Sequence, residues 1–293
     1  MAASRTSRGR PSRDNAGVID LQSHSTVSDG EFPPAEVVRL AAEAGITTLA
    51  LTDHDSVDGI AEASAAAEEL GIELVPAVEM SSVHPTCEDL HILGYWIDVD
   101  AMRPTCERAQ EERVERARQI VDRLNQHGVE VSFDDAIAEA GDASSVGRPH
   151  IARAAGVAKD EMSPFFEEYL VPGAKAFVAR SWPTSVEAAG LIRQAGGSVV
   201  LAHPFWDLDD PDQVAGLIAD LPLDGVEVFY PSHTREQTEF LLEICRRDGL
   251  AATASADFHG PQNKNFHTFG AYSTYDLGQP ELPPPGKRSR STK

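Results

Sequence analysis

The chain has 293 residues, and its 25 Lys and Arg residues stand against 47 Asp and Glu residues, which gives a formal net charge of −22. This acidic balance disfavours binding to long duplex nucleic acid through a basic surface and docking on an anionic membrane, because both depend on Lys and Arg. Hydrophobic residues make up 41% of the chain, enough for a core, so the chain as a whole is not disordered.

The two ends of the chain differ in composition from the rest. Residues 1–16 and 277–293 are rich in Ser, Arg and Pro, carry mostly basic charges and show no apolar periodicity. We therefore expect two disordered tails. No apolar segment follows the basic N-terminus as in a secretory signal, and no run of about 18 apolar residues could span a membrane. The 3 widely spaced cysteines form no CxxC motif and fit a reducing cytoplasm.

Strand-like and helix-like segments alternate from residue 17 to residue 102. Apolar runs predict strands at 18–21, 47–52, 72–78 and 90–97. Helical patterns that end at a glycine predict helices at 33–44 and 57–70. The predicted strands are apolar on both faces, a pattern typical of a parallel sheet covered by helices.

Residues 103–176 interrupt this alternation, because only helices are predicted there. The charged segment 107–123 has apolar residues at helical spacing and predicts a solvated amphipathic helix. The alternation resumes over residues 177–276, with strands predicted at 198–202, 225–229 and 251–255 and helices at 185–195, 211–219 and 234–248. At least seven strands of this kind predict a (β/α) barrel, in which functional groups lie at the C-terminal ends of the strands.

Nearly every predicted strand end carries a His, Asp or Glu. These residues are His24, Asp29, His54, Glu79, His91, His203, Asp257 and His259. Carboxylates that converge in one cleft would repel one another, and divalent cations remove that conflict. Mixed imidazole and carboxylate ligands suit Zn, Mn or Fe. The alternative interpretation is a cleft of unrelated polar residues.

The motifs around these residues resemble those of the PHP (polymerase and histidinol phosphatase) family of metal-dependent phosphoesterases. They are D-L-Q-S-H-S at 20–25, S-D-G at 28–30, T-D-H-D at 52–55, Glu79, L-H-I-L-G at 90–94, A-H-P at 202–204 and D-F-H-G at 257–260. The resemblance covers residues 18 to about 275. It implies an α/β fold, a distorted (β/α)7 TIM-like barrel over residues 17–102 and 177–276, with residues 103–176 inserted as a small helical subdomain.

The resemblance also implies two or three divalent metal ions and their ligands. The first metal would take Gln22, His24, Glu79 and Asp257, the second Asp29, His54 and His259, and the third His91 and His203, with Glu79 as a bridge. The family has a histidine where this chain has Gln22, and an amide oxygen is a weaker ligand for Zn-like ions than a neutral imidazole. Weaker binding of the first metal, a positioned water and a loss of activity are all open. We expect an active enzyme with altered metal occupancy.

Candidate substrate contacts lie in the insert and the late loops. The G-R-P-H segment at 147–150 resembles a PHP subgroup that acts on nucleotide phosphates, and this resemblance implies that Arg148 contacts phosphate. His150, Lys175 and His233 are further candidates, and His233 could act as a general acid. The alternatives are a salt bridge for Arg148, a structural role for His150 and a solvated side chain for Lys175.

The sequence therefore predicts a cytoplasmic phosphoesterase that uses a metal-bound hydroxide on a small, nucleotide-like phosphate ester. The resembling subgroup implies a nucleotide bisphosphate or a short 5′-phosphorylated oligonucleotide as the substrate. A histidinol-phosphate-type phosphatase and a catalytically weakened nucleotide- or metal-binding protein are the alternatives. No protein partner is evident from the sequence.

Overall fold

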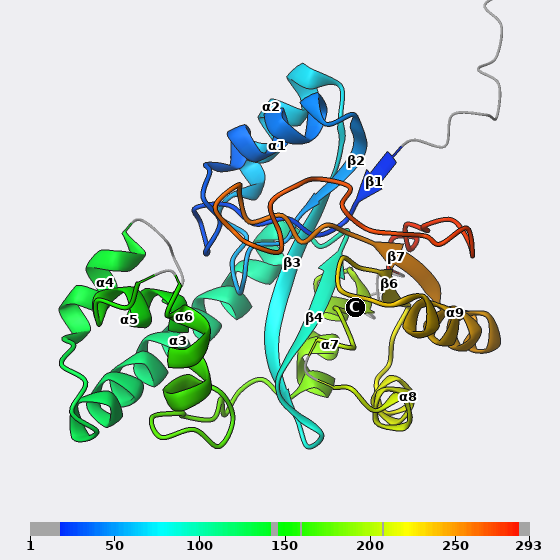
Figure 1. The fold of residues 1–293 in the computed structure, drawn as a ribbon. Coiled ribbons are helices and arrows are strands. Elements are labelled where there is room, and N and C mark those ends of the chain that lie inside the picture. Colours follow the sequence, from blue (N-terminus) through cyan, green and yellow to red (C-terminus); the bar gives the residue numbers. More distant parts are fainter. Residues whose placement is uncertain (1–17, 142–145, 159, 207, 287–293) are drawn as a thin grey trace, which may run out of the picture.

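A seven-stranded sheet forms the centre of the molecule (Figure 1). The computed structural model describes residues 18–141, 146–158, 160–206 and 208–286. The strands follow one another in chain order and are β1 (Val18–Asp20), β2 (Ile46–Leu51), β3 (Glu73–His84), β4 (Cys87–Tyr95), β5 (Ser198–Leu201), β6 (Gly225–Phe229) and β7 (Ala251–Ala254). The last strand lies beside the end of the first, because Leu21 N–H, directly after β1, donates to Ala254 O at the end of β7 at 3.0 Å. The fold is the expected distorted (β/α)7 barrel.

Strand β4 runs against both of its neighbours. β1, β2 and β3 pair in parallel, as do β5, β6 and β7, whereas β4 is antiparallel to β3 and to β5. The prediction of a parallel sheet is therefore wrong for β4. The reason is the tight turn between His84 and Cys87, which are paired in register and leave no room for a crossover helix. Because β4 is reversed, His91 in its middle lies opposite Ser81, in the second half of β3, towards the end of the barrel where the parallel strands have their C-terminal ends.

Two apolar layers pack against the sheet, one inside the barrel and one between the barrel and its helices. The inner layer is formed by small and branched side chains of the strands together with Tyr95, whose hydroxyl donates to Leu21 O at 2.8 Å across the interior. The outer layer lies between the sheet and the helices α1 (Pro34–Glu43), α2 (Ile60–Leu70), α7 (Ser185–Gln194), α8 (Pro211–Asp220) and α9 (Arg235–Asp248). The glycine stops predicted for the first two helices are confirmed, since Gly45 after α1 and Gly71 after α2 have φ of 84° and 73°.

The segment between β4 and α7 forms a helical insert beside the sheet, drawn in green in Figure 1. It contains α3 (Val99–Gln126), α4 (Phe133–Ala140), α5 (Arg148–Ala154), α6 (Met162–Phe165) and a π-helical turn at Phe166–Leu170. Apolar residues early in α3, such as Met102, belong to the barrel core, and later ones, such as Leu124, belong to a separate core of the insert. The predicted domain boundary at residue 103 thus falls inside one continuous helix.

The segment 277–286 does not match the expected disorder. Glu281 N–H donates to Ala252 O at 2.8 Å, Trp96 Nε1–H donates to Pro283 O at 2.8 Å, and the Ser198 hydroxyl donates to Pro284 O. The prolines hold this segment extended, so its carbonyls can accept hydrogen bonds from the start of the barrel strands. The tail prediction is wrong for these residues, whereas residues 1–16 and 287–293 lie outside the described residues. Across the part of the chain that the structure describes, no helix has both the length and the apolarity needed to cross a membrane.

Candidate metal centre

Eight polar side chains from six strands and their loops meet at one end of the barrel. His24 and Asp29 follow β1, His54 follows β2, Glu79 and His91 lie in β3 and β4, His203 follows β5, and Asp257 and His259 follow β7. Each of these residues lies in a buried strand or in the segment that follows one. The strands therefore fix the backbone positions from which the polar side chains meet at this end of the barrel. The side chains predicted from the strand ends are therefore close together in space.

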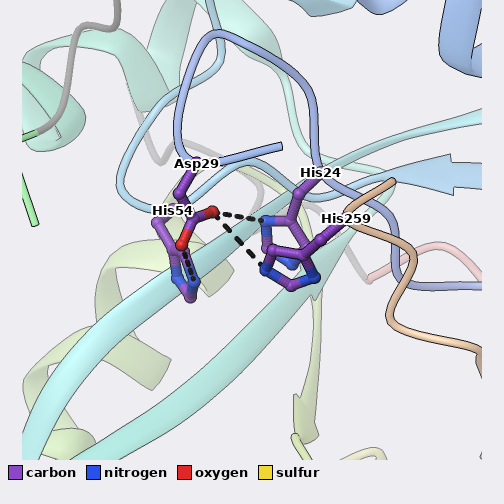
Figure 2. Close-up of side chains that lie close together, drawn as sticks. All are labelled: His24, Asp29, His54 and His259. Atoms are coloured by element: carbon purple, nitrogen blue, oxygen red, sulfur yellow. Dashed lines mark ion pairs between the residues drawn. The ribbon is translucent and has the colours of Figure 1, made fainter. Parts of the chain in front are cut away.

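Asp29 lies at the centre of a first group (Figure 2). One carboxylate oxygen lies 3.8 Å from His24 Nδ1 and 3.5 Å from His259 Nε2, and the other lies 3.9 Å from His54 Nε2. The rings of His24 and His259 stack with centroids 4.2 Å apart. One ligand atom from each of the four residues lies within 4.8 Å of the others, a spacing that a metal ion can span.

Glu79 joins this first group to a second. Its Oε2 lies 3.1 Å from His24 Nε2 and 3.5 Å from His54 Nδ1. Its Oε1 lies 2.7 Å from His91 Nδ1 and 3.2 Å from His203 Nε2. Glu79 is fully buried and touches both sets of histidines, which is the position expected of a bridging carboxylate.

Several ligand atoms of this centre are buried and lack hydrogen-bond partners among the described residues. They are His24 Nε2, His54 Nδ1, Glu79 Oε2 and Asp257 Oδ1. Buried polar atoms without partners are costly, and native proteins rarely leave them so. Imidazole nitrogens and carboxylate oxygens are ligands of divalent metals. The residues present therefore fit divalent metal ions.

The charge states of Asp29, Glu79 and His54 suit metal binding. Burial alone would raise the pKa of Asp29, but His54 and His259 lower it well below its usual value. Burial would likewise raise the pKa of Glu79, and His54 and His91 lower it. Burial lowers the pKa of His54 to about 3, so its imidazole is neutral at pH 7. Burial would lower the pKa of His24 and His203, but neighbouring carboxylates raise it, to about 9 for His203. Ionised carboxylates and neutral imidazoles are the forms that bind metals, so a metal would displace protons from these two rings.

Asp53 holds the loop that carries His24 and Asp29. Its carboxylate accepts the Ser25 N–H and the Ser25 hydroxyl, both at 2.8 Å, and the Ser28 hydroxyl at 2.7 Å. On the far side, Glu227 accepts the backbone N–H of His203 at 2.8 Å. Sequence reasoning did not single out either acid as functional, although Asp53 lies next to His54 in the T-D-H-D motif.

An arginine-lined pocket opens beside the centre. Its walls include Asp29, His54, His91, Asp89 and four arginines from three parts of the chain, namely Arg113, Arg116, Arg148 and Arg180. The sequence identified only Arg148. It missed Arg113 and Arg116 because they lie in the charged helix that we predicted to be solvated, and no motif distinguishes Arg180.

The arginines of this pocket outnumber the acids that pair with them. Arg113 and Arg148 each donate to a buried acid, Asp55 and Asp89. Arg180 lies 3.8 and 3.9 Å from the same two acids, yet its Nε and Nη1 have no hydrogen-bond partner among the described residues. One guanidinium nitrogen of Arg116 is also buried without a partner. These nitrogens can donate to an anion that enters the pocket.

A PHP domain model matches residues 20–141. A 3′,5′-nucleoside bisphosphate phosphatase of Chromobacterium violaceum is 37% identical over 83% of this chain and 87% of the relative. The chain belongs to the PHP domain family. It is an enzyme of the metal-dependent phosphoesterase type, a hydrolase, as its sequence motifs predicted.

Two further comparisons support this family assignment. A 5′-3′ exoribonuclease of Haemophilus influenzae is 35% identical over 83% of this PHP chain and 90% of the relative. A solved structure of a protein assigned as a metal-dependent phosphoesterase from Bifidobacterium adolescentis superposes with a TM-score of 0.75 and 31% identity, over 88% of this chain and 92% of that one. The likeness extends over the barrel and the insert together.

Three of the predicted substrate contacts of this PHP chain lie outside the arginine pocket. Lys175 is half exposed and pairs with Glu168. His150 is buried and its Nδ1 accepts the N–H of Gly147 at 3.0 Å, a cap for α5. His233 is buried behind the strand ends, with Nδ1 bonded to Val228 O at 2.9 Å. Burial lowers the pKa of His233 to about 4, which leaves no proton for a general acid at neutral pH. A contact of these three residues with substrate stays a prediction.

Gln22 has the same unusual surroundings as the candidate ligands. Its side chain is fully buried, and neither Oε1 nor Nε2 has a hydrogen-bond partner among the described residues. A buried amide without partners costs free energy unless something else binds it. Its part in a metal site remains a prediction.

Proposed function

We propose that this PHP enzyme hydrolyses a phosphate ester of a small nucleotide-like substrate, either a nucleoside bisphosphate or a short 5′-phosphorylated oligonucleotide. The observation that carries the proposal is the shared wall between two sites. His54, His91 and Asp29 belong to the candidate metal centre and also line the arginine pocket. A substrate with two phosphates could place one at the centre and the other among the arginines.

For the metal ligands we keep the division that the family resemblance implies. His24, Glu79, Asp257 and Gln22 would hold one metal, Asp29, His54 and His259 a second, and Glu79, His91 and His203 a third. Bound divalent metals supply a water of lowered pKa and neutralise charge on the phosphoryl group. We propose Mn, Zn or Fe, because the ligand set mixes imidazole with carboxylate.

The protein's own groups would orient the substrate. Arg180 and Arg116 have guanidinium nitrogens free to donate to phosphate oxygens, and two donors from one guanidinium can bind two oxygens of the same phosphate. Burial lowers the pKa of Arg116 to about 9, so it remains charged at pH 7. This local positive charge would admit an anionic substrate to a protein whose overall charge is −22.

The relatives support the same substrate class. One acts, by its name, on 3′,5′-nucleoside bisphosphates and another on RNA from its 5′ end. A small phosphorylated molecule is thus the proposed partner, and no long duplex is expected. We also propose a cytoplasmic location, because three widely spaced cysteines without a CxxC motif fit a reducing compartment.

Phosphate release from a substrate panel tests the proposal. The metal-loaded enzyme would be assayed with adenosine 3′,5′-bisphosphate, a 5′-phosphorylated trinucleotide, adenosine 5′-monophosphate and histidinol phosphate. We expect the highest kcat/KM with one of the first two. A preference for histidinol phosphate would favour the amino-alcohol phosphatase alternative. Nucleotide binding without release of any phosphate would favour a non-catalytic binding protein.

A further inference from the structure

One aromatic side chain beside the candidate metal centre is exposed to solvent. Trp206 keeps 46% of its surface exposed. The other large apolar side chains exposed among the described residues belong to β1, α2, α4 and α7 rather than to the loops that carry the candidate ligands; they are Val18, Leu70, Ile137 and Val186. An exposed indole next to a polar centre is therefore particular to this loop.

A tight turn fixes Trp206 close to a candidate ligand. Trp206 N–H donates to His203 O at 2.8 Å, which closes a four-residue turn with Pro204 in its second position. Phe205 anchors the turn, because its ring is 7% exposed and lies 6.0 Å from that of Phe240. The backbone of Trp206 is thus held in place while its side chain reaches solvent.

Buried rings support one side of the indole. The Trp206 ring centroid lies 5.4 Å from that of Phe266 and 6.4 Å from those of Tyr230 and His203. Phe266 in turn lies 5.7 Å from His259, and the Tyr230 hydroxyl donates to Asp257 at 2.8 Å. The aromatic layer therefore begins at the candidate ligands and ends in an exposed indole.

We propose that Trp206 is the platform on which the nucleobase of the substrate stacks, an inference that rests on the proposed function. The ring centroid of His203 lies 6.4 Å from that of Trp206 and 5.3 Å from that of His91. His91 lines the arginine pocket. The platform and the pocket therefore both adjoin the candidate ligands, so a nucleoside bisphosphate could place one phosphate at the centre, the other among the arginines and its base on the indole.

This arrangement predicts which substrates the enzyme distinguishes. Stacking uses the face that every base has, so it gives affinity for a nucleotide with little choice among bases. The enzyme should therefore accept purine and pyrimidine nucleotides with similar kcat/KM and should use a substrate without a base poorly.

Two variants and two substrates test the platform by turnover. Adenosine 3′,5′-bisphosphate would be compared with an abasic deoxyribose 3,5-bisphosphate in Trp206→Ala and Trp206→Phe. We expect Trp206→Ala to lower kcat/KM for the nucleotide by roughly 5- to 150-fold and to leave that for the abasic compound unchanged. Trp206→Phe should keep most of the activity, because it keeps a stacking ring. An equal loss with both substrates, or no loss, would overturn the platform even with a fully active enzyme.

Fluorescence tests the platform without turnover. Adenosine 5′-monophosphate would be titrated to millimolar concentration into chelator-treated protein, which contains 3 tryptophans. We expect quenching that disappears in Trp206→Phe and persists in Trp182→Phe, since Trp182 stacks under Arg108, with 3.8 Å from the guanidinium carbon to the ring centroid. Quenching that persists in Trp206→Phe, or no quenching of the wild type, would overturn the inference. An enzyme that releases no phosphate but shows the expected quenching would instead contradict only the proposed function.

Discussion

The carboxylate of Asp55 lies 2.5 Å from Nε of Arg113, and this buried ion pair joins the loop that carries His54 to helix α3 of the insert. Ser81 of β3 completes the contact, since its N–H donates to Asp55 at 2.8 Å and its hydroxyl accepts from Arg113 at 2.6 Å. Burial would raise the pKa of Asp55, but Arg113 and Arg180 lower it. The pair therefore fixes the arginine pocket relative to the candidate metal centre.

Removal of Asp55 should destabilise the protein strongly. Asp55→Ala leaves the buried guanidinium of Arg113 without its partner, and loss of one member of a buried pair costs roughly 3–5 kcal/mol. The measurement is the free energy of unfolding in urea. Asp58→Ala is the matched control, because Asp58 pairs with Arg103 at the surface, where both side chains are more than 40% exposed. The control should change stability by less than about 1 kcal/mol. Similar values for the two variants would contradict a structural role for the Asp55 pair.

Arg180→Gln should weaken binding of a second phosphate. A charge-assisted hydrogen bond contributes roughly 1.5–3 kcal/mol, so we expect KM for adenosine 3′,5′-bisphosphate to rise by roughly 10- to 150-fold. KM for 4-nitrophenyl phosphate should change little, because it has no second phosphate. Arg153→Gln is the control, since Arg153 pairs with Glu139 on the surface of the insert. Equal changes in KM for the two substrates would show that Arg180 does not act on the second phosphate.

Substitution of a candidate ligand should remove metal and activity together. His54→Ala and Asp257→Ala each delete a buried candidate ligand atom that has no hydrogen-bond partner among the described residues. Even residues that only support metal ligands contribute roughly 10- to 100-fold, so kcat should fall by more than about 100-fold. Elemental analysis should find less metal per chain than in the wild type. His127→Ala, at the exposed end of α3, is the control. Full activity in either ligand variant would contradict the assignment of the centre.

The candidate ligands could be predicted from the sequence because each lies beside an apolar strand. A strand fixes where its end lies, so His24, His54 and His203 needed only the strand pattern to be brought together. The reversal of β4 was missed, because the strands predicted at 72–78 and 90–97 left out the residues that form the tight turn between His84 and Cys87.

The arginine pocket could not be predicted in this way. Arg113 and Arg116 lie on a helix whose charged residues look solvated by periodicity alone. Their burial depends on Asp55 and Asp89, which come from distant loops and strands. Helical periodicity records one apolar face, whereas α3 packs against two cores and presents arginines between them. Charge pairs between residues so far apart in the chain produce no local sequence pattern.

Replacement of Gln22 by histidine should strengthen metal binding. The buried amide of Gln22 has no hydrogen-bond partner among the described residues, and a neutral imidazole is a better ligand for Zn-like ions than an amide oxygen. We expect Gln22→His to raise the affinity of the first metal by at least about tenfold, the order that supporting residues contribute at metal sites. Competition with a fluorescent chelator measures it. Gln119→His, exposed on α3, is the control, and an affinity unchanged in both would remove Gln22 from the metal site.

His150, the buried histidine that caps α5, should make the protein less stable in acid. Burial lowers the pKa of His150 to about 4, whereas an unfolded chain titrates it near 6.5. A lowered folded-state pKa means that the neutral form is favoured in the folded protein, so its stability is fully present above about pH 6.5 and is lost as the pH falls towards 4. Between pH 8 and pH 5 this histidine should remove about 2 kcal/mol from the free energy of unfolding.

His150→Gln separates the titration from the cap. A glutamine at this third helical position can still accept the N–H of Gly147, as in a capping box, but it does not titrate. Urea unfolding of chelator-treated wild type and variant at pH 8 and pH 5 measures the difference. The variant should match the wild type at pH 8 within about 1 kcal/mol and should be more stable than it at pH 5, because only the wild type must exclude a proton from the buried ring on folding. Parallel loss of stability in both proteins would assign the acid sensitivity to other groups.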